Sequence, residues 1–148
     1  MSIKSFRGQI ADLGIETIPL HTNDGSTGYR IVKLQLFAVS PAGTTSESLV
    51  KVFSTPQTAA NNQVDFNDQT LIASAFLANS NNPAYNTESV VIFDNTVFNQ
   101  DIYLTHNEEV SAGNDIPVNY YIELEQIKLD LNENTVATLK DIRNIKGQ

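Results

Sequence analysis

The chain has 148 residues, 41% of them hydrophobic, with no cysteine and a formal net charge of −8. This length predicts a single domain over residues 1–148 whose core needs no disulfide, and the apolar content excludes a disordered polar tract. The negative charge opposes contacts to phosphate, so we expect no nucleic-acid partner. No apolar run approaches the about 18 residues of a membrane span, so we expect no membrane partner.

The first ten residues, "MSIKSFRGQI", place apolar Ile3 and Phe6 beside basic Lys4 and Arg7. This segment (1–10) forms either the first strand or an arm that contacts a neighbouring subunit, and the sequence leaves both open. It lacks the apolar centre of a secretory signal peptide, which predicts a protein made in a cytoplasm.

Short segments of alternating apolar and polar residues follow, separated by turns at intervals of about 8–12 residues. The segment "ETIPL" (16–20) predicts an edge strand or the end of a strand, because Pro19 cannot donate a hydrogen bond within a sheet. The next, "RIVKLQLFAV" (30–39), predicts a half-buried strand whose inward residues are Val32, Leu34, Leu36 and Ala38.

The later segments continue the pattern with two variations. "ESVVIFDN" (88–95) is a continuous apolar run, typical of a fully buried strand, and "NYYIELEQIKLDL" (119–131) changes parity near Glu125 and Gln126, which predicts a bulge there. The remaining predicted strands are "SLVKVFS" (48–54) with Val50 and Val52 inward, "QTLIASAFLA" (69–78), and "DIYLTH" (101–106).

Together these segments predict an all-β fold, an antiparallel β-sandwich or jelly roll of about eight strands. Three stretches rich in Asn, Ser, Thr or acidic residues, 54–68, 79–88 and 106–117, predict exposed loops.

Residues 133–146 depart from this pattern. Apolar side chains recur there every three residues and predict a short C-terminal helix, which docks either on its own sandwich or on a neighbouring subunit. The stripe consists of Val136, Leu139, Ile142 and Ile145.

No group of residues has the spacing of a catalytic, metal or cofactor site. Gly25 and Gly28 are too close for a phosphate-binding loop, so "HTNDGSTGYR" predicts a turn. His21 and His106 each stand at a predicted strand end, where we expect a solvated or turn-capping role rather than a metal pair.

Acidic residues give the same result. Glu123 and Glu125 fall on the predicted wet face of one strand, and Glu108, Glu109 and Asp115 lack the spacing of a calcium loop. The chain is therefore expected to be neither an enzyme nor a cofactor-binding protein.

Three stretches carry a resemblance to a known family: "LHTNDGSTGYRIVKLQLF", "VIFDNTVFNQDIYLTH" and "PVNYYIELEQIKLDLNENTVATLKDIRN". In this order they resemble a small virion structural protein of marine tailed bacteriophages, including those that infect cyanobacteria. The resemblance implies a non-enzymatic virion component, a decoration or cement protein on the outside of the capsid. Its implied partners are the major capsid protein, other virion subunits and further copies of itself.

Two alternatives stay open. One is a tail, adaptor or fibre-attachment protein of the virion, and the other is a glycan-binding β-sandwich in which Tyr85 and Tyr103 stack on sugar rings. For the virion roles, the two ends of the chain are the predicted contact surfaces. The contact residues are Ile3, Phe6, Arg7, Val136, Leu139, Ile142 and Ile145.

Overall fold

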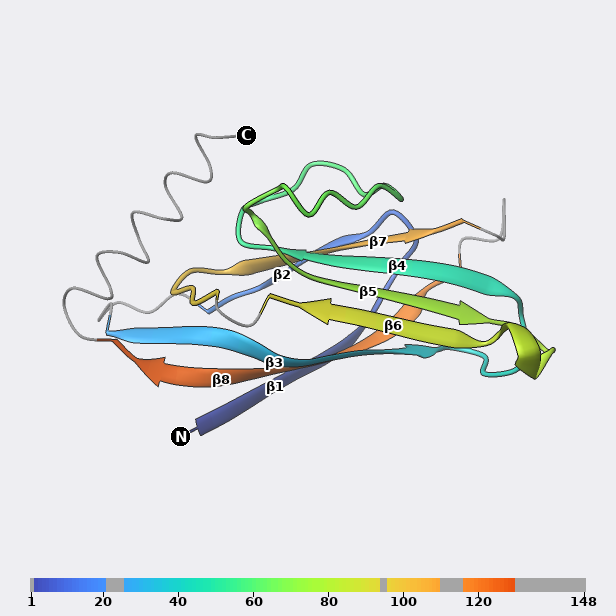
Figure 1. Cartoon of the computed structure of the whole chain (residues 1–148), viewed down its shortest axis with the longest axis horizontal. Helices are drawn as coiled ribbons and strands as arrows, with labels where there is room; N and C mark the ends of the chain where they lie inside the picture. Colours follow the sequence, from blue (N-terminus) through green and yellow to red (C-terminus); the bar gives the residue numbers. More distant parts are fainter. Residues whose placement is uncertain (1, 21–25, 94–95, 110–115, 130–148) are drawn as a thin grey trace.

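A computed structural model describes residues 2–20, 26–93, 96–109 and 116–129 (Figure 1). Within these residues the chain forms eight β-strands and one turn of 3-10 helix, η1 (Pro83–Tyr85). The strands are β1 (Ser2–Ile10), β2 (Ile15–Ile18), β3 (Thr27–Ala38), β4 (Ser46–Phe53), β5 (Leu71–Asn79), β6 (Thr87–Ile92), β7 (Ile102–Glu108) and β8 (Val118–Lys128). The prediction of an all-β chain of about eight strands is confirmed, whereas the predicted helix over 133–146 lies outside the described residues.

The strands form two antiparallel sheets that lie over one another (Figure 1). The three-stranded sheet has the order β1-β8-β3, and the five-stranded sheet has the order β2-β7-β4-β5-β6. Consecutive strands often fall in different sheets, so the chain crosses between the layers at β1–β2, β2–β3, β3–β4 and β7–β8. The result is a sandwich-like arrangement of two layers.

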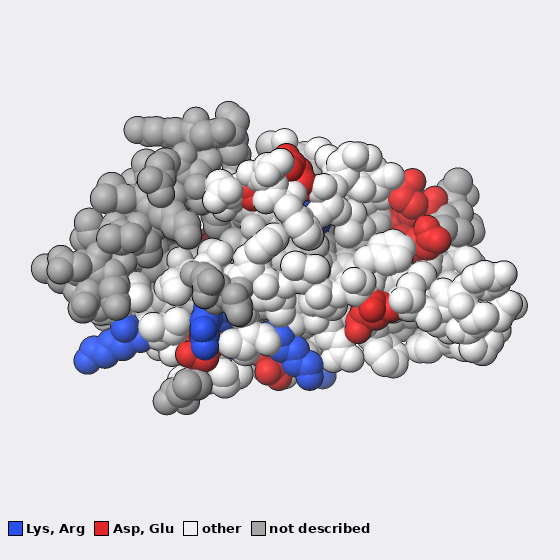
Figure 2. Space-filling view, viewed as in Figure 1, with Lys and Arg blue, Asp and Glu red and all other residues white. Residues whose placement is uncertain are grey.

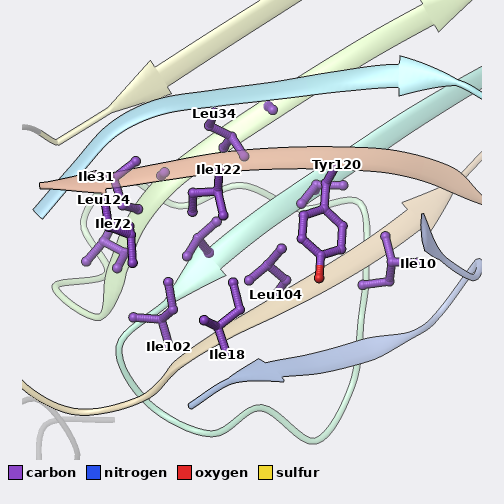
Figure 3. Close-up of a cluster of buried hydrophobic side chains, with 14 of the residues drawn as sticks. Ile10, Ile18, Ile31, Leu34, Ile72, Ile102, Leu104, Tyr120, Ile122 and Leu124 are labelled. Atoms are coloured by element: carbon purple, nitrogen blue, oxygen red, sulfur yellow. The ribbon is translucent and has the colours of Figure 1, made fainter. Parts of the chain in front are cut away.

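The core lies between the layers and takes its side chains from both sheets (Figure 3). Ile122 and Leu124 from β8 face Ile102 and Leu104 from β7, and all four are fully buried. Along each strand these buried residues alternate with polar neighbours, as the alternating pattern of the sequence predicts for a strand with one face on the core. The predicted inward positions Leu34, Leu36, Val50 and Val52 are confirmed in the same core.

Strand β3 differs from the prediction at Val32. The register between β3 and β8 shifts between Ile31 and Lys33, which makes Val32 an extra residue in β3. Val32 is therefore exposed and Ile31 is buried. The bulge predicted at residues 125–126 of β8 is wrong, because β8 keeps an unbroken register with β1 there and the irregularity lies across the ladder in β3.

Strand β6 is also placed differently. Its apolar run predicted a fully buried strand, but β6 is the edge strand of the five-stranded sheet, and its Val91 is exposed. Only Val90 and Ile92, which alternate with Val91, pack against the core. By contrast, β2 is the opposite edge strand and ends just before Pro19, so the edge prediction for that segment is confirmed.

Candidate functional site

Basic side chains are concentrated on the three-stranded sheet. Of the six Lys and Arg residues in the described part of the chain, five lie on its strands and only Lys51 lies elsewhere. The same strands carry two acidic residues, Glu123 and Glu125, whereas the rest of the described chain carries nine. In Figure 2 the blue side chains gather along the lower margin, where Figure 1 draws β1, β3 and β8. The five basic residues are Lys4, Arg7, Arg30, Lys33 and Lys128.

The outer face of this sheet is ordered by the register of its strands. Residues directly opposite in an antiparallel pair point to the same side, so the face consists of four rows that cross β1, β8 and β3. The rows are Ile3–Glu125–Arg30, Ser5–Glu123–Lys33, Arg7–Tyr121–Gln35 and Gln9–Asn119–Phe37. The first two rows place acids between their neighbours, whereas the last two combine amides, aromatic rings and one guanidinium group.

The two acids on this face are already engaged. Arg30 Nη2 lies 3.1 Å from Glu125 Oε2. The Tyr121 hydroxyl donates to Glu123 Oε2 at 2.6 Å, and this bond raises the pKa of Tyr121. Because both carboxylates have partners, the basic character of this face is carried mainly by Arg7 and Lys33, whereas Lys4 lies in the inward row of Leu124 and Ile31.

An open hollow of about 510 Å³ lies over the last two rows. Side chains from all three strands surround it, and the backbone of Gly8 and Tyr120 lies between them. The side chains are Arg7, Gln35, Phe37, Asn119 and Tyr121. Gln9 Nε2 donates to Asn119 Oδ1 at 3.1 Å, and the Asn119 amide nitrogen has no partner among the described residues.

Strand β1 leaves one edge of the same sheet open. It pairs with β8 over its whole length, and within the described chain no strand pairs with its other side. Residues 2–5 are exposed on both faces of the strand. The opposite edge of the sheet is covered at two points, where Tyr29 exchanges backbone bonds with Phe98 and the Leu36 amide donates to the Glu88 carboxylate.

The contact residues predicted in the N-terminal segment therefore lie in a strand. Ile3 and Arg7 are on the outer face of β1, whereas Phe6 points inward and packs against the core. The other predicted contact residues, Val136, Leu139, Ile142 and Ile145, lie outside the described residues. Tyr85 and Tyr103 do not form one platform, because Tyr85 precedes β6 and Tyr103 is on β7, with β4 and β5 between these strands.

His106 differs from the expectation of a solvated residue at a strand end. It lies within β7, is fully buried, and its Nδ1 lies 3.1 Å from the carbonyl oxygens of both Ile10 and Ala11. Carbonyls only accept, so Nδ1 carries the proton, and the buried Nε2 has no partner in the described chain. Burial lowers the pKa of His106, despite opposing effects of these carbonyls, Asp12 and Glu108. The other histidine, His21, is outside the described residues.

Lys51 is a second buried ionisable group. It lies on the outer face of the five-stranded sheet, beneath the loop 54–70, and Nζ donates to Asn61 Oδ1 at 2.9 Å and to the Gln63 carbonyl at 2.7 Å. Burial lowers the pKa of Lys51 more than the nearby Asp68 carboxylate raises it. Both of these bonds hold the loop to the sheet, so Lys51 stabilises the fold.

Within the described ranges, no three His, Cys, Asp or Glu residues are grouped so that they could hold a metal ion. The same ranges contain no helix long and apolar enough to cross a membrane. No protein-family model matches the sequence, and no curated protein is significantly similar to it. The outer face of the three-stranded sheet, with its hollow and the β1 edge, is the candidate interaction site.

The sequence indicated only part of this site. Lys4 and Arg7 stood out as basic residues in a mixed basic and apolar segment at the chain start, but Gln35, Phe37, Asn119 and Tyr121 appeared only as outward positions of two strands. Their proximity depends on β8 lying between β1 and β3, which is a long-range pairing that alternation within one strand does not reveal.

Proposed function

We propose that this chain is a non-enzymatic structural protein of a tailed bacteriophage, a decoration protein on the outer head surface. Its partner in this proposal is the major capsid protein or another virion subunit, bound through the open edge of β1. The resemblance of three sequence stretches to a phage virion protein supports this role, and so do the strand order and the charge distribution described above.

The strand order supports a jelly roll. Rolling up one long antiparallel ribbon of eight strands pairs the first strand with the last, the second with the seventh, and the fourth with the fifth. Here β1 pairs with β8, β2 with β7, and β4 with β5. The remaining pair of such a ribbon, β3 with β6, lacks a ladder, but the two strands remain linked by the bond from the Leu36 amide to Glu88. Jelly rolls are common in viral capsid proteins and lectins, so the fold is compatible with the role without deciding it.

The open β1 edge is the observation that carries the proposal. A strand of nine residues with an unpaired side can accept a further strand, which gains main-chain hydrogen bonds along its length. Lys4 and Arg7 give this edge a positive charge, which favours an acidic segment over a basic one. Many weak contacts of this kind become effective when copies of the chain occupy one lattice.

Particle location and copy number test the role. We expect quantitative mass spectrometry of purified virions to find the chain in a copy number comparable to the major capsid protein, and immunogold labelling to mark the head. Label confined to the tail would favour the tail or adaptor alternative over decoration. A chain that is absent from purified virions would refute both.

Two sets of variants test the edge. Charge reversal of Lys4 and Arg7 to Glu should lower occupancy on stripped particles, whereas the matched change Lys33→Glu, on the outer face of the same sheet but on β3, should leave it unchanged. Lys4→Pro and Ser5→Pro form a second set, because consecutive amides of β1 point to opposite sides. One of these changes removes an amide that bonds to β8 and should lower the melting temperature. The other removes an amide on the open side of β1, so this variant should keep its melting temperature but bind less to the particles. Parental binding by both sets would exclude the β1 edge as the attachment surface.

A further inference from the structure

The hollow on the outer face of the three-stranded sheet has the features of a ligand site that lies beside the β1 edge and shares Arg7 with it. Its volume of about 510 Å³ lies within the range of about 300–1,000 Å³ typical of small-molecule sites. It lies over the middle strand β8, whose neighbours β1 and β3 already occupy both of its sides. A peptide therefore has no free strand edge to pair with here, and a ligand must be bound by side chains.

The side chains around the hollow mainly present hydrogen-bond donors. The side chains of Arg7 and Gln35 and the amide nitrogen of Asn119 make no hydrogen bond to the described part of the chain, whereas the Asn119 amide oxygen accepts from Gln9. None of the residues that line the hollow is Asp or Glu. Such a set favours a ligand rich in acceptor oxygens, and the guanidinium of Arg7 favours one that includes a carboxylate.

An aromatic ring completes the hollow. Phe37 is 59% exposed, although it stands in a strand that buries Leu34 and Leu36 on its other side. Its phenyl ring lies in the same row as Asn119 and Gln9, so an apolar face stands beside two amides. The C–H face of a pyranose ring can lie on such a surface while the ring hydroxyls reach the amides.

We propose that this hollow binds an acidic glycan, a chain of pyranose sugars that carry carboxylates. Phe37 contacts the face of one sugar ring, Gln35 and Asn119 donate to its hydroxyl and ring oxygens, and Arg7 pairs with the carboxylate. The site uses residues from all three strands, so its geometry is fixed by the register of the sheet rather than by a loop.

Titration calorimetry of the isolated protein with trigalacturonate tests this proposal without any particle. We expect saturable binding that neutral maltotriose does not reproduce, and about tenfold weaker binding for both Arg7→Gln and Phe37→Ala. Matched controls are Arg30→Gln, whose guanidinium is paired with Glu125, and Phe66→Ala, which removes a phenylalanine of similar exposure outside the hollow. Both controls should bind like the parent.

Three results would overturn the proposal: no binding of trigalacturonate, equal binding of maltotriose, or an equal loss in the control variants. Equal competition by a short poly-glutamate peptide would also overturn it, since this would reduce the hollow to a generally basic surface. Arg7, Phe37 and Phe66 are exposed and Arg30 is half-buried, and unchanged melting temperatures confirm that all four variants are folded. Because no virion takes part, failure here leaves the attachment proposal untouched.

Discussion

Acidification should destabilise the fold through the buried side chain of His106. Its Nδ1–H donates to the carbonyl oxygens of Ile10 and Ala11, where the chain leaves β1 and turns toward β2. The backbone of His106 holds the same corner, because its carbonyl accepts from the Leu13 amide and its amide donates to Gly14. Protonation would place a second N–H at Nε2, which is buried and has no acceptor in the described chain.

The sign of the effect follows from the direction of the pKa shift. Burial holds the pKa of His106 below its usual 6.5, so the unfolded chain takes up a proton at a higher pH than the folded chain does. The contribution to stability is therefore complete above about pH 6.5 and is lost as the pH falls toward the folded-state pKa. One proton changes the free energy of unfolding by at most about 1.4 kcal/mol per pH unit, which gives up to about 2 kcal/mol between pH 6.5 and 5.

Urea denaturation at a series of pH values measures this effect. His106→Gln should unfold more easily at neutral pH by about 1–3 kcal/mol, because the carbonyls of Ile10 and Ala11 lose their donor, but its stability should fall less on acidification. His21→Gln removes the chain's other histidine and serves as the matched control, with the pH profile of the parent. The reasoning would be refuted if the free energy of unfolding of the parent and of His106→Gln changed in parallel with pH. It would also be refuted by an NMR titration midpoint of His106 above 6.5.

Three further changes test other parts of the fold. Ile122→Ala should lower the free energy of unfolding by about 2–5 kcal/mol in urea denaturation, because Ile122 is fully buried between the layers. Lys51→Ala should speed hydrogen exchange in the loop 54–70 while the strands stay protected, because both bonds from Nζ to that loop are lost. Gly8→Ala should lower the melting temperature, because an added Cβ would lie 2.9 Å from the Tyr120 hydroxyl and displace it from its bond to Glu16.

The local pattern of the sequence was enough to predict most strands. Alternation placed Val50 and Val52 on the buried side correctly, because both lie in a strand with one face on the core. Pro19 likewise marked the end of an edge strand. These features depend on residues close together in the chain, and the period of two records them directly.

The errors arose where the environment of a strand depends on distant partners. A run such as "ESVVIFDN" has the same composition in a central strand and in an edge strand, and only the sheet order shows that β6 is at the edge. The bulge at Val32 was missed because Val32, Leu34 and Leu36 alternate without interruption in the sequence, and the extra residue shows only in the pairing of β3 with β8. The prediction of a solvated or turn-capping role for His106 missed its burial, because the corner between β1 and β2 that covers it lies about a hundred residues earlier in the chain.

The position of β8 has a consequence for how the chain folds. β8 is the last of the described strands in the chain but the middle strand of its sheet. During synthesis, β1 and β3 therefore have no strand to pair with in this sheet until residues 118–128 leave the ribosome. The pairs β4–β5 and β5–β6 join neighbours in sequence and can form earlier, whereas β1 must wait for a partner more than a hundred residues away. A nascent chain stopped before Val118 would expose three unpaired strand edges on β1 and β3, and such chains should aggregate or be degraded rather than accumulate as partly folded protein.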